Sequence, residues 1–226
     1  MKKGFIISII LTLTWLSLSK AQINYYNYTT KNFRKQAIFE ETIDTANPDL
    51  ARLNAVLFYL TNEIRKKKRL AEVTYHPKLE AAATIHSKSM VAYNFFSHIN
   101  KHSKELHDPN ARARFVGIAN PYLAENIIET FVLEYNAGDK VYPGKKGEFR
   151  YAPDEDPIKP RTYIKLGEVI LKAWMNSPDH RENILSKKAV QLGCGTAFYV
   201  KNDFNGMPAV IATQNFQLHE PLRMPY

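Results

Sequence analysis

The strongest constraint on the fold is a pair of alternating segments near the C-terminus. Within 190–200 and 210–216, apolar side chains recur at every second position, which is the period of a β-strand with one buried face. Asn205 and Gly206 lie between these segments, and this dipeptide is typical of a tight hairpin turn. The chain is therefore predicted to end in an antiparallel hairpin. Its single cysteine, Cys194, is expected to be buried in the first strand and chemically inert.

Helices are predicted ahead of the hairpin from capping residues and from apolar residues spaced three or four apart. Their expected starts are Asn47 as an N-cap, Pro77, about Thr162, and Ser177 as the N-cap of a short helix. Residues 99–120 are polar and indicate an irregular segment, whereas 124–132 indicate a strand. Helices followed by an antiparallel hairpin favour the α+β class.

The two ends of the chain and one long internal segment are predicted to lie outside this regular pattern. Residues 1–21 combine a charged start, an apolar run and a small-residue cleavage point, which is typical of a secretory signal peptide. They predict export, with no membrane span left after cleavage. Residues 22–46 predict a weakly ordered polar arm, and 220–226 predict a tail. The domain is expected over 47–219, with a Gly- and Pro-rich insertion at 133–161 that is long enough to be functional.

The net charge is basic without identifying a partner. The sequence carries 31 Lys and Arg against 22 Asp and Glu, a formal charge of +9, and loss of residues 1–21 lowers this to about +6. The run from Arg65 to Arg69 lies at a predicted helix C-terminus, where the helix dipole favours positive charge. A nucleic-acid patch is the alternative, but an exported chain seldom meets nucleic acid. We therefore expect a monomer with no nucleic acid partner.

Two histidines and one glutamate supply the candidate chemistry. His98 follows an aromatic helix end, and Glu125 lies in the otherwise uncharged stretch 122–128. His180 lies in the first turn of a predicted helix, where the positive end of the dipole favours a neutral ring. Two imidazoles and a carboxylate with an open position form a known type of zinc site. The spacing alone also allows three separate structural roles for these residues.

Other polar residues support weaker hypotheses. His98 and His102 are four residues apart with His107 nearby, which is a helical metal spacing, but this segment is expected to be a loop. His86 lies on an apolar helix stripe, which favours a hydrogen-bonded core histidine. Ser177 precedes a histidine closely enough to suggest a nucleophile, but its position is better explained as an N-cap.

A set of short segments, in one order along the chain, points to a known family. They are Asn62-Glu63-Ile64-Arg65, Phe95-Phe96-Ser97-His98, Ala124-Glu125-Asn126-Ile127, Ala173-Trp174-Met175-Asn176-Ser177-Pro178-Asp179-His180-Arg181-Glu182-Asn183-Ile184-Leu185, Gly193-Cys194-Gly195 and Ala212-Thr213-Gln214-Asn215-Phe216. Together they resemble the CAP domain family (cysteine-rich secretory proteins, antigen 5, pathogenesis-related 1), also called the SCP domain, in its cysteine-poor bacterial form. The resemblance covers roughly 48–217.

The resemblance implies a three-layer α-β-α sandwich with a central antiparallel sheet and a cleft lined by histidines and acidic residues. By position, it makes His98 and His180 the cleft histidines and Glu125 the cleft glutamate, together able to bind a divalent metal, zinc above all. The second family glutamate falls near Asn176-Ser177, where neither residue is acidic, so a three-residue site is expected. The further candidates for lining the ligand cleft are His86, Asn126 and Ser177.

The resemblance implies a secreted or periplasmic protein whose cleft binds a divalent metal and an unidentified ligand, such as a lipid or an envelope component. The first alternative is a metal-dependent hydrolase acting on envelope peptides, glycans or lipids, with Glu125 as ligand or general base. The second is a surface interaction protein that binds an anionic polymer through the basic run and the long loop. The insertion at 133–161 is also placed to cover or narrow the cleft.

Overall fold

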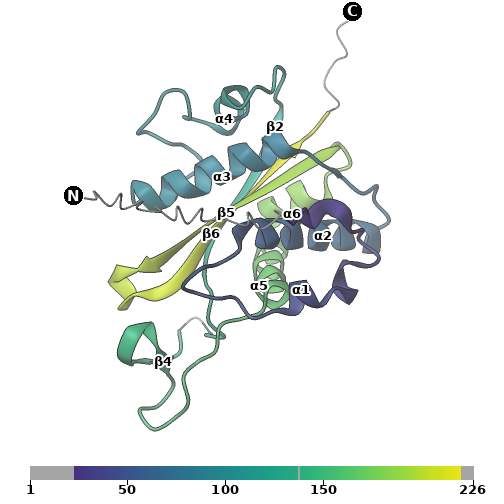
Figure 1. Cartoon of the computed structure of the whole chain (residues 1–226). Helices are drawn as coiled ribbons and strands as arrows, with labels where there is room; N and C mark the ends of the chain where they lie inside the picture. The colour runs from purple at the N-terminus through teal and green to yellow at the C-terminus, as the bar shows by residue number, and fades with distance from the viewer. Residues whose placement is uncertain (1–22, 137, 220–226) are drawn as a thin grey trace, which may run out of the picture.

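A four-stranded sheet forms the centre of the computed structural model, which describes residues 23–136 and 138–219 (Figure 1). Its strands, in spatial order, are β1 (Thr74–Tyr75), β5 (Gln191–Lys201), β6 (Met207–Gln217) and β2 (Leu123–Phe131). β6 pairs antiparallel with both β5 and β2, whereas the short β1 is parallel to β5. The predicted signal peptide over 1–21 and the tail over 220–226 lie outside the described residues.

Helices pack on both faces of the sheet. On one face, α3 (Pro77–Ala92) contacts β5 and β6, and α4 (Pro109–Phe115) contacts α3 and β2. The opposite layer contains α2 (Leu50–Lys67), α5 (Tyr163–Asn176) and α6 (Pro178–Leu185), with α1 (Ala37–Glu40) against α5. The α+β class and the three-layer sandwich implied by the resemblance are confirmed.

The helix starts follow the capping signals, with one correction. α3 begins at Pro77 as predicted, and Thr162 caps α5 by accepting a hydrogen bond from the Lys165 N–H. The first long helix begins at Leu50, because its N-cap is Asp49 and not Asn47. The Asp49 carboxylate accepts a hydrogen bond from the Arg52 N–H at 3.0 Å, which satisfies a donor that the helix leaves unpaired.

The hairpin has the predicted strands and turn. Asn205 and Gly206 adopt φ values of 50° and 79° in the left-handed region, directly after the short 3-10 helix η4 (Asn202–Phe204). Cys194 is fully buried in β5, as expected, and burial raises the pKa of its thiol well above the ordinary value. A thiol in this environment is a poor nucleophile.

The prediction of a weakly ordered arm over 22–46 is wrong for the residues that the structure describes. This segment contains η1 (Tyr25–Asn27), η2 (Phe33–Lys35) and α1. Phe33 and Phe39 are fully buried, and the Phe33 ring stacks on Tyr59 of α2 with 5.0 Å between ring centroids. The aromatic side chains, spaced irregularly among polar ones, bury enough apolar surface to fix the segment against the helical layer.

The segment 99–120, predicted to be irregular, contains α4. Its cap is Asp108, whose carboxylate accepts a hydrogen bond from the Ala111 N–H at 2.8 Å, and Pro109 occupies the first helical position. Aspartate followed by proline is a helix start signal, so this helix was readable from the sequence.

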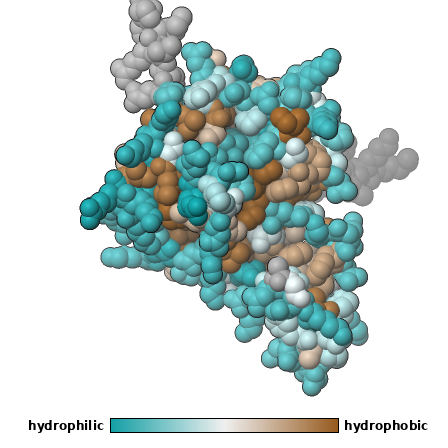
Figure 2. Space-filling view, turned by 180° about the vertical axis from the view of Figure 1, so that it is seen from behind, coloured by the Kyte–Doolittle hydropathy of each residue, from teal (hydrophilic) through white to brown (hydrophobic). Residues whose placement is uncertain are grey.

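The insertion at 133–161 forms a small lobe around a second hydrophobic core, to which β6 contributes Met207. It contains the paired strands β3 (Tyr142–Pro143) and β4 (Phe149–Arg150) and the 3-10 helix η3 (Lys145–Gly147). The buried members of its core are Leu133, Tyr135, Phe149, Ile158 and Met207. The lobe projects from one end of the body in both the ribbon and the space-filling view (Figures 1 and 2).

A close helix–sheet approach gives the first testable prediction. A Cβ on Gly195 would overlap backbone atoms of Ala83 and Thr84 in α3. Gly195→Ala must therefore push α3 away from the sheet, and we expect it to lower the free energy of unfolding by about 3 kcal/mol. Urea denaturation followed by circular dichroism measures this change.

The matched control is Gly144→Ala in the lobe, where the nearest atom to a new Cβ is Glu148 Cβ at 3.2 Å. This contact can relax, so we expect a change below about 1 kcal/mol. Equal effects at Gly144 and Gly195 would contradict the close packing of α3 on β5.

Candidate functional site

Glu125 lies at the centre of the candidate site, with 2% of its side chain exposed in β2. Arg112 Nη2 donates to both carboxylate oxygens, at 2.9 Å to Oε1 and 2.8 Å to Oε2. His98 Nδ1 lies 2.9 Å from Oε1. With its amide oriented to match its neighbours, Asn215 donates to Oε2 at 2.9 Å and accepts from the Ala83 N–H. Both oxygens of Glu125 are therefore occupied by donors from this chain.

Arg112 holds the loop that leads from α3 to α4. Its side chain is fully buried, and Nη1 donates to the Leu106 carbonyl at 3.0 Å while Nη2 donates to the His98 carbonyl at 3.2 Å. A guanidinium suits this place because its planar fork reaches several oxygens at once. The sequence analysis did not identify Arg112. The signal that would have found it is the Asp108-Pro109 start of α4, which brings an arginine beside β2.

His98 is oriented by Glu125. Because a carboxylate can only accept hydrogen bonds, the 2.9 Å contact assigns the proton of His98 to Nδ1. The other ring nitrogen, Nε2, then carries a lone pair in the neutral ring, and 47% of the side chain is exposed. A histidine held in this way by a carboxylate is the usual support for a metal-binding imidazole.

His180 is positioned from the opposite helical layer. Its backbone carbonyl accepts a hydrogen bond from Asn126 Nδ2 at 3.1 Å, and Asn126 is in turn bound by Asn183 of α6 at 2.9 Å. Burial lowers the pKa of His180, and the charge of His98 lowers it further, whereas Asp179 opposes the shift. The ring is therefore neutral at neutral pH, as its place in the first turn of α6 predicted.

His86 is a core residue without the hydrogen bonds expected of one. It lies fully buried in α3, with Nε2 3.7 Å from Glu125 Oε1, which is too long for a hydrogen bond. Neither ring nitrogen has a partner within the part of the chain that the structure describes. Burial lowers the pKa of His86 to about 4, although Glu125 opposes the shift. The ring therefore stays neutral over most of the pH range.

The remaining sequence candidates take structural positions. His102 stacks on Tyr93 with 4.7 Å between ring centroids, and His107 lies beside Asp108. Asn126 is fully buried and binds the backbone of α6. Ser177 precedes Pro178 at the start of α6 as predicted, but its hydroxyl makes no capping hydrogen bond.

The segment between Trp174 and Asn183 holds β2 in place. Trp174 Nε1 donates to the Ile127 carbonyl at 3.2 Å, and Asn183 Nδ2 donates to the Glu125 carbonyl at 3.4 Å. β2 is the last strand in the sheet order, so its outer carbonyls have no neighbouring strand to pair with. These two side chains satisfy them and connect the layer that carries His180 to the strand that carries Glu125.

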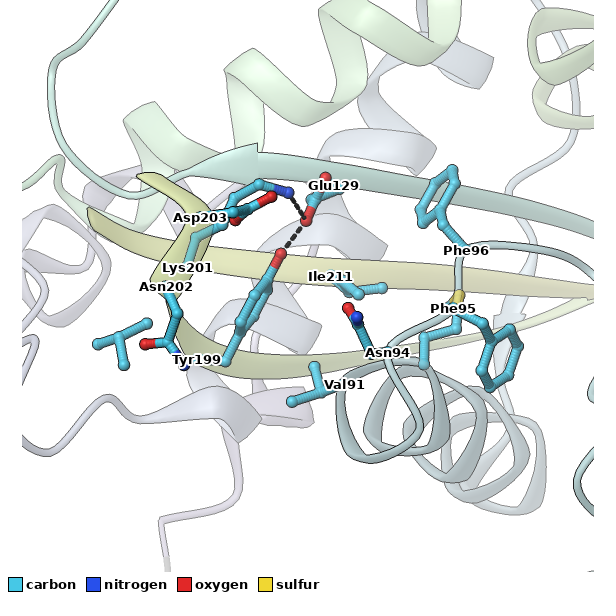
Figure 3. A pocket seen from close by; sticks show the side chains of 12 residues that line it. Val91, Asn94, Phe95, Phe96, Glu129, Tyr199, Lys201, Asn202, Asp203 and Ile211 are labelled. Carbon is cyan, nitrogen blue, oxygen red and sulfur yellow. Dashed lines mark hydrogen bonds and ion pairs between the residues drawn. The ribbon is translucent and has the colours of Figure 1, made fainter. Parts of the chain in front are cut away.

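A groove of about 870 Å³ lies on the same side of the sheet as α3, and none of Glu125, His98 and His180 lines it. Figure 3 shows it between the end of α3 and the β5–β6 hairpin, with Phe95 and Phe96 at one end and Lys201 and Asp203 at the other. Glu129 accepts hydrogen bonds from Tyr199 and Lys201 in its wall. Phe96 lies two residues from His98. None of the described residues of 133–161 lines this groove, so the lobe does not cover it.

The residues fit a divalent metal only in part. His98 Nε2 and the neutral His180 ring are donors of the type that zinc prefers. Glu125 does not fit as a third ligand, because its oxygens already face Arg112, His98 and Asn215. No group of three or more His, Cys, Asp or Glu side chains within 23–136 and 138–219 is placed to hold a metal ion. The three-residue zinc site is therefore untested, and these contacts leave His98 and His180 as its candidate ligands.

Comparisons with known proteins agree with the family resemblance found in the sequence. The model of the cysteine-rich secretory protein family, CAP, matches residues 58–216. An extracellular protein from Bacillus anthracis that contains a SCP domain aligns with a TM-score of 0.51 and 23% identity, over 76% of this chain and 41% of that protein. This chain therefore spans less than half of that protein's length. The likeness supports the fold.

Two further solved structures align less closely. An outer surface protein from Borrelia burgdorferi gives a TM-score of 0.47 at 14% identity, over 79% of this chain and 98% of that one. A cysteine-rich secretory protein from Staphylococcus aureus gives 0.45 at 14% identity, over 75% and 39%. No curated protein matches the sequence.

Removal of the buried cation gives a prediction for Arg112. Arg112→Met leaves the Glu125 carboxylate buried without its ion pair, and we expect the free energy of unfolding to fall by about 3 to 5 kcal/mol. Adding Glu125→Gln removes the unpaired charge, so the double variant should regain part of the loss. Urea denaturation of the single and double variants measures both effects. A double variant less stable than Arg112→Met would contradict the charge compensation.

The buried His86 gives a pH prediction. Its pKa is about 4 in the folded protein and roughly 6.5 in the unfolded chain. Between these values the unfolded chain binds a proton that the folded protein does not bind. The free energy of unfolding therefore falls as the pH decreases from 6.5 to 4, by about 3 kcal/mol from this residue.

Urea denaturation at several pH values between 4 and 7 tests this, with His86→Leu as the variant. We expect a shallower pH dependence for His86→Leu, since the group that titrates only in the unfolded chain is gone. His102→Leu, at an exposed histidine that stacks on Tyr93, is the control and should keep the slope of the unaltered protein. An unchanged slope in His86→Leu would contradict the assignment.

Proposed function

This chain belongs to the cysteine-rich secretory protein (CAP) family, as its motifs predicted, and from that premise we propose that it is an exported binding protein. Its cleft presents two imidazoles, His98 and His180, to a ligand. The observation that carries the proposal is the 2.9 Å contact between His98 Nδ1 and Glu125, because it directs the Nε2 lone pair away from the protein interior.

A divalent metal, zinc above all, is the first ligand that we propose for these imidazoles. His98 Nε2 and His180 would hold it, and Glu125 would act as a positioning residue behind His98. Bound zinc supplies a Lewis acid that attracts oxygen or nitrogen donors of a further ligand. Two protein donors leave other positions open, which suits binding of a further ligand better than a closed structural site.

The groove between the end of α3 and the β5–β6 hairpin supports a ligand with an apolar part. Its volume of about 870 Å³ lies within the range of small-molecule sites. Met90, Phe95 and Ile211 supply apolar lining, and polar groups gather at the hairpin end. A lipid or another envelope component with a polar head fits this distribution. Such a ligand would reach His98 from the end of the groove nearest Phe96.

Export is part of the proposal and rests on the sequence. Residues 1–21 have the pattern of a signal peptide. Within the described residues, no helix combines the length and the apolar character needed to cross a membrane. The Bacillus anthracis protein is an extracellular protein, which agrees with export.

The geometry favours binding over hydrolysis. A hydrolase of the proposed type needs a carboxylate lone pair that faces a water molecule in the cleft. Both Glu125 oxygens instead accept hydrogen bonds from Arg112, His98 and Asn215. Glu125 is therefore better placed to orient His98 than to act as a general base.

Zinc titration by isothermal calorimetry tests the metal proposal. Glu125→Gln weakens the orientation of His98, and we expect zinc affinity to fall by about tenfold. His98→Ala and His180→Ala each remove a direct donor and should reduce the affinity further. Circular dichroism checks that the variants remain folded.

His102→Ala is the matched control, because it removes a nearby histidine that stacks on Tyr93 and does not contact Glu125. It should bind zinc as the unaltered protein does. Equal zinc binding by His98→Ala, His180→Ala and His102→Ala would overturn the proposed site.

A further inference from the structure

A second site lies where the ends of α2 and α6 meet, around the buried side chain of Arg65. Its guanidinium donates to the carbonyls of Ala71 at 2.9 Å, Ile184 at 2.8 Å, Ser186 at 2.9 Å and Ala189 at 3.3 Å. Arg65, the first residue of the basic run, is therefore a buried structural residue, whereas residues 66–69 are exposed. It joins the segment that follows α2 to the segment that follows α6, and Figure 1 shows the two helices in the same layer.

Six exposed cations lie on these two joined segments. They are Lys66, Lys67, Lys68, Arg69, Lys187 and Lys188, named here the α2–α6 basic patch. None of the six forms an ion pair with a carboxylate among the residues that the structure describes, whereas Arg34, Lys165 and Lys201 do so elsewhere on the surface. The patch therefore keeps its positive charge available to a partner.

The backbone at Arg69 points to a role beyond helix termination. Arg69 has φ 59°, and the hydrogen bonds from the Leu70 N–H to Arg65 O and from the Arg69 N–H to Lys66 O form a Schellman motif. Glycine is the usual residue at this position, because other residues are strained there. The helix dipole accounts for cations in the last turn of α2, but Arg69 lies beyond that turn.

We propose that the α2–α6 basic patch binds an anionic polysaccharide that carries phosphate or sulfate groups. Six cations on two rigidly joined segments match a partner with several anionic groups along a chain better than a single small anion. The six large apolar side chains exposed on the described surface all lie outside both segments. A membrane-inserting amphipathic helix would use such side chains as anchors, so a polymer is the better match. This binding goes beyond the cleft function and does not depend on it.

The test measures binding of a fluorescent heparin oligosaccharide to the full chain by anisotropy. Affinity should fall as sodium chloride is raised, because salt screens exposed charges. Arg69→Gly removes one cation and also relieves the backbone strain. We expect it to weaken binding by about fivefold while raising Tm by about 2 to 4 °C. A purely structural arginine would not give this opposite pair of effects.

Asn94→Gly is the matched control for the backbone, because Asn94 has φ 49° at the end of α3 and carries no charge. It should raise Tm and leave heparin binding unchanged. Lys187→Gln/Lys188→Gln should weaken binding, whereas Lys101→Gln/Lys104→Gln removes the same charge from the loop before α4 and should not. Unchanged binding in Arg69→Gly, or equal losses in the two lysine pairs, would overturn the patch.

Two further probes test the class of partner. Duplex DNA of matched length and vesicles containing phosphatidylglycerol are titrated at the same salt concentration. We expect both to bind more weakly than the heparin oligosaccharide. Equal or tighter binding to DNA or to the vesicles would overturn the assignment to a polysaccharide.

Discussion

The buried ion pair between Arg112 and Glu125 is the interaction on which the site depends. A carboxylate with 2% of its side chain exposed has lost its hydration, and the protein must replace it. Arg112 does so only because α4 lies beside β2, and the same guanidinium binds the carbonyls of Leu106 and His98. One charge pair therefore holds β2 and the loop before α4 together. It also fixes the orientation of the His98 ring, whose Nδ1 faces Glu125.

The opposite helical layer controls the same strand from its outer edge. Trp174 and Asn183 donate to carbonyls of β2 that no strand pairs, and Asn126 returns a hydrogen bond to the His180 carbonyl. The long motif that carries His180 therefore also holds the backbone of β2. α5 and α6 pack directly on β2. Displacement of either helix would therefore shift Glu125 and His180 together.

The sequence predicted the parts of this arrangement that depend on local patterns. Alternation identified the β5–β6 hairpin, and Pro77 and Thr162 marked helix starts, because period and capping are local properties. His98 and Glu125, which the resemblance placed in one site, are in contact at 2.9 Å. The Arg112 partner was missed because an ion pair between α4 and β2 is a tertiary contact, and the core role of Phe33 and Phe39 was missed because their spacing follows no regular period.

Two buried arginines show that the net charge of this chain overstates the positive charge exposed on its surface. Arg65 and Arg112 are both fully buried, and each donates to backbone carbonyls of loops or of a last helical turn. Such carbonyls have no partner in a helix or sheet, and a guanidinium with five donors can satisfy several of them at once. Part of the formal charge of +9 therefore organises loops. The loops that these arginines hold are those that present His98 on one side and Lys187 and Lys188 on the other, so the buried cations determine where the exposed ones and the imidazole are displayed.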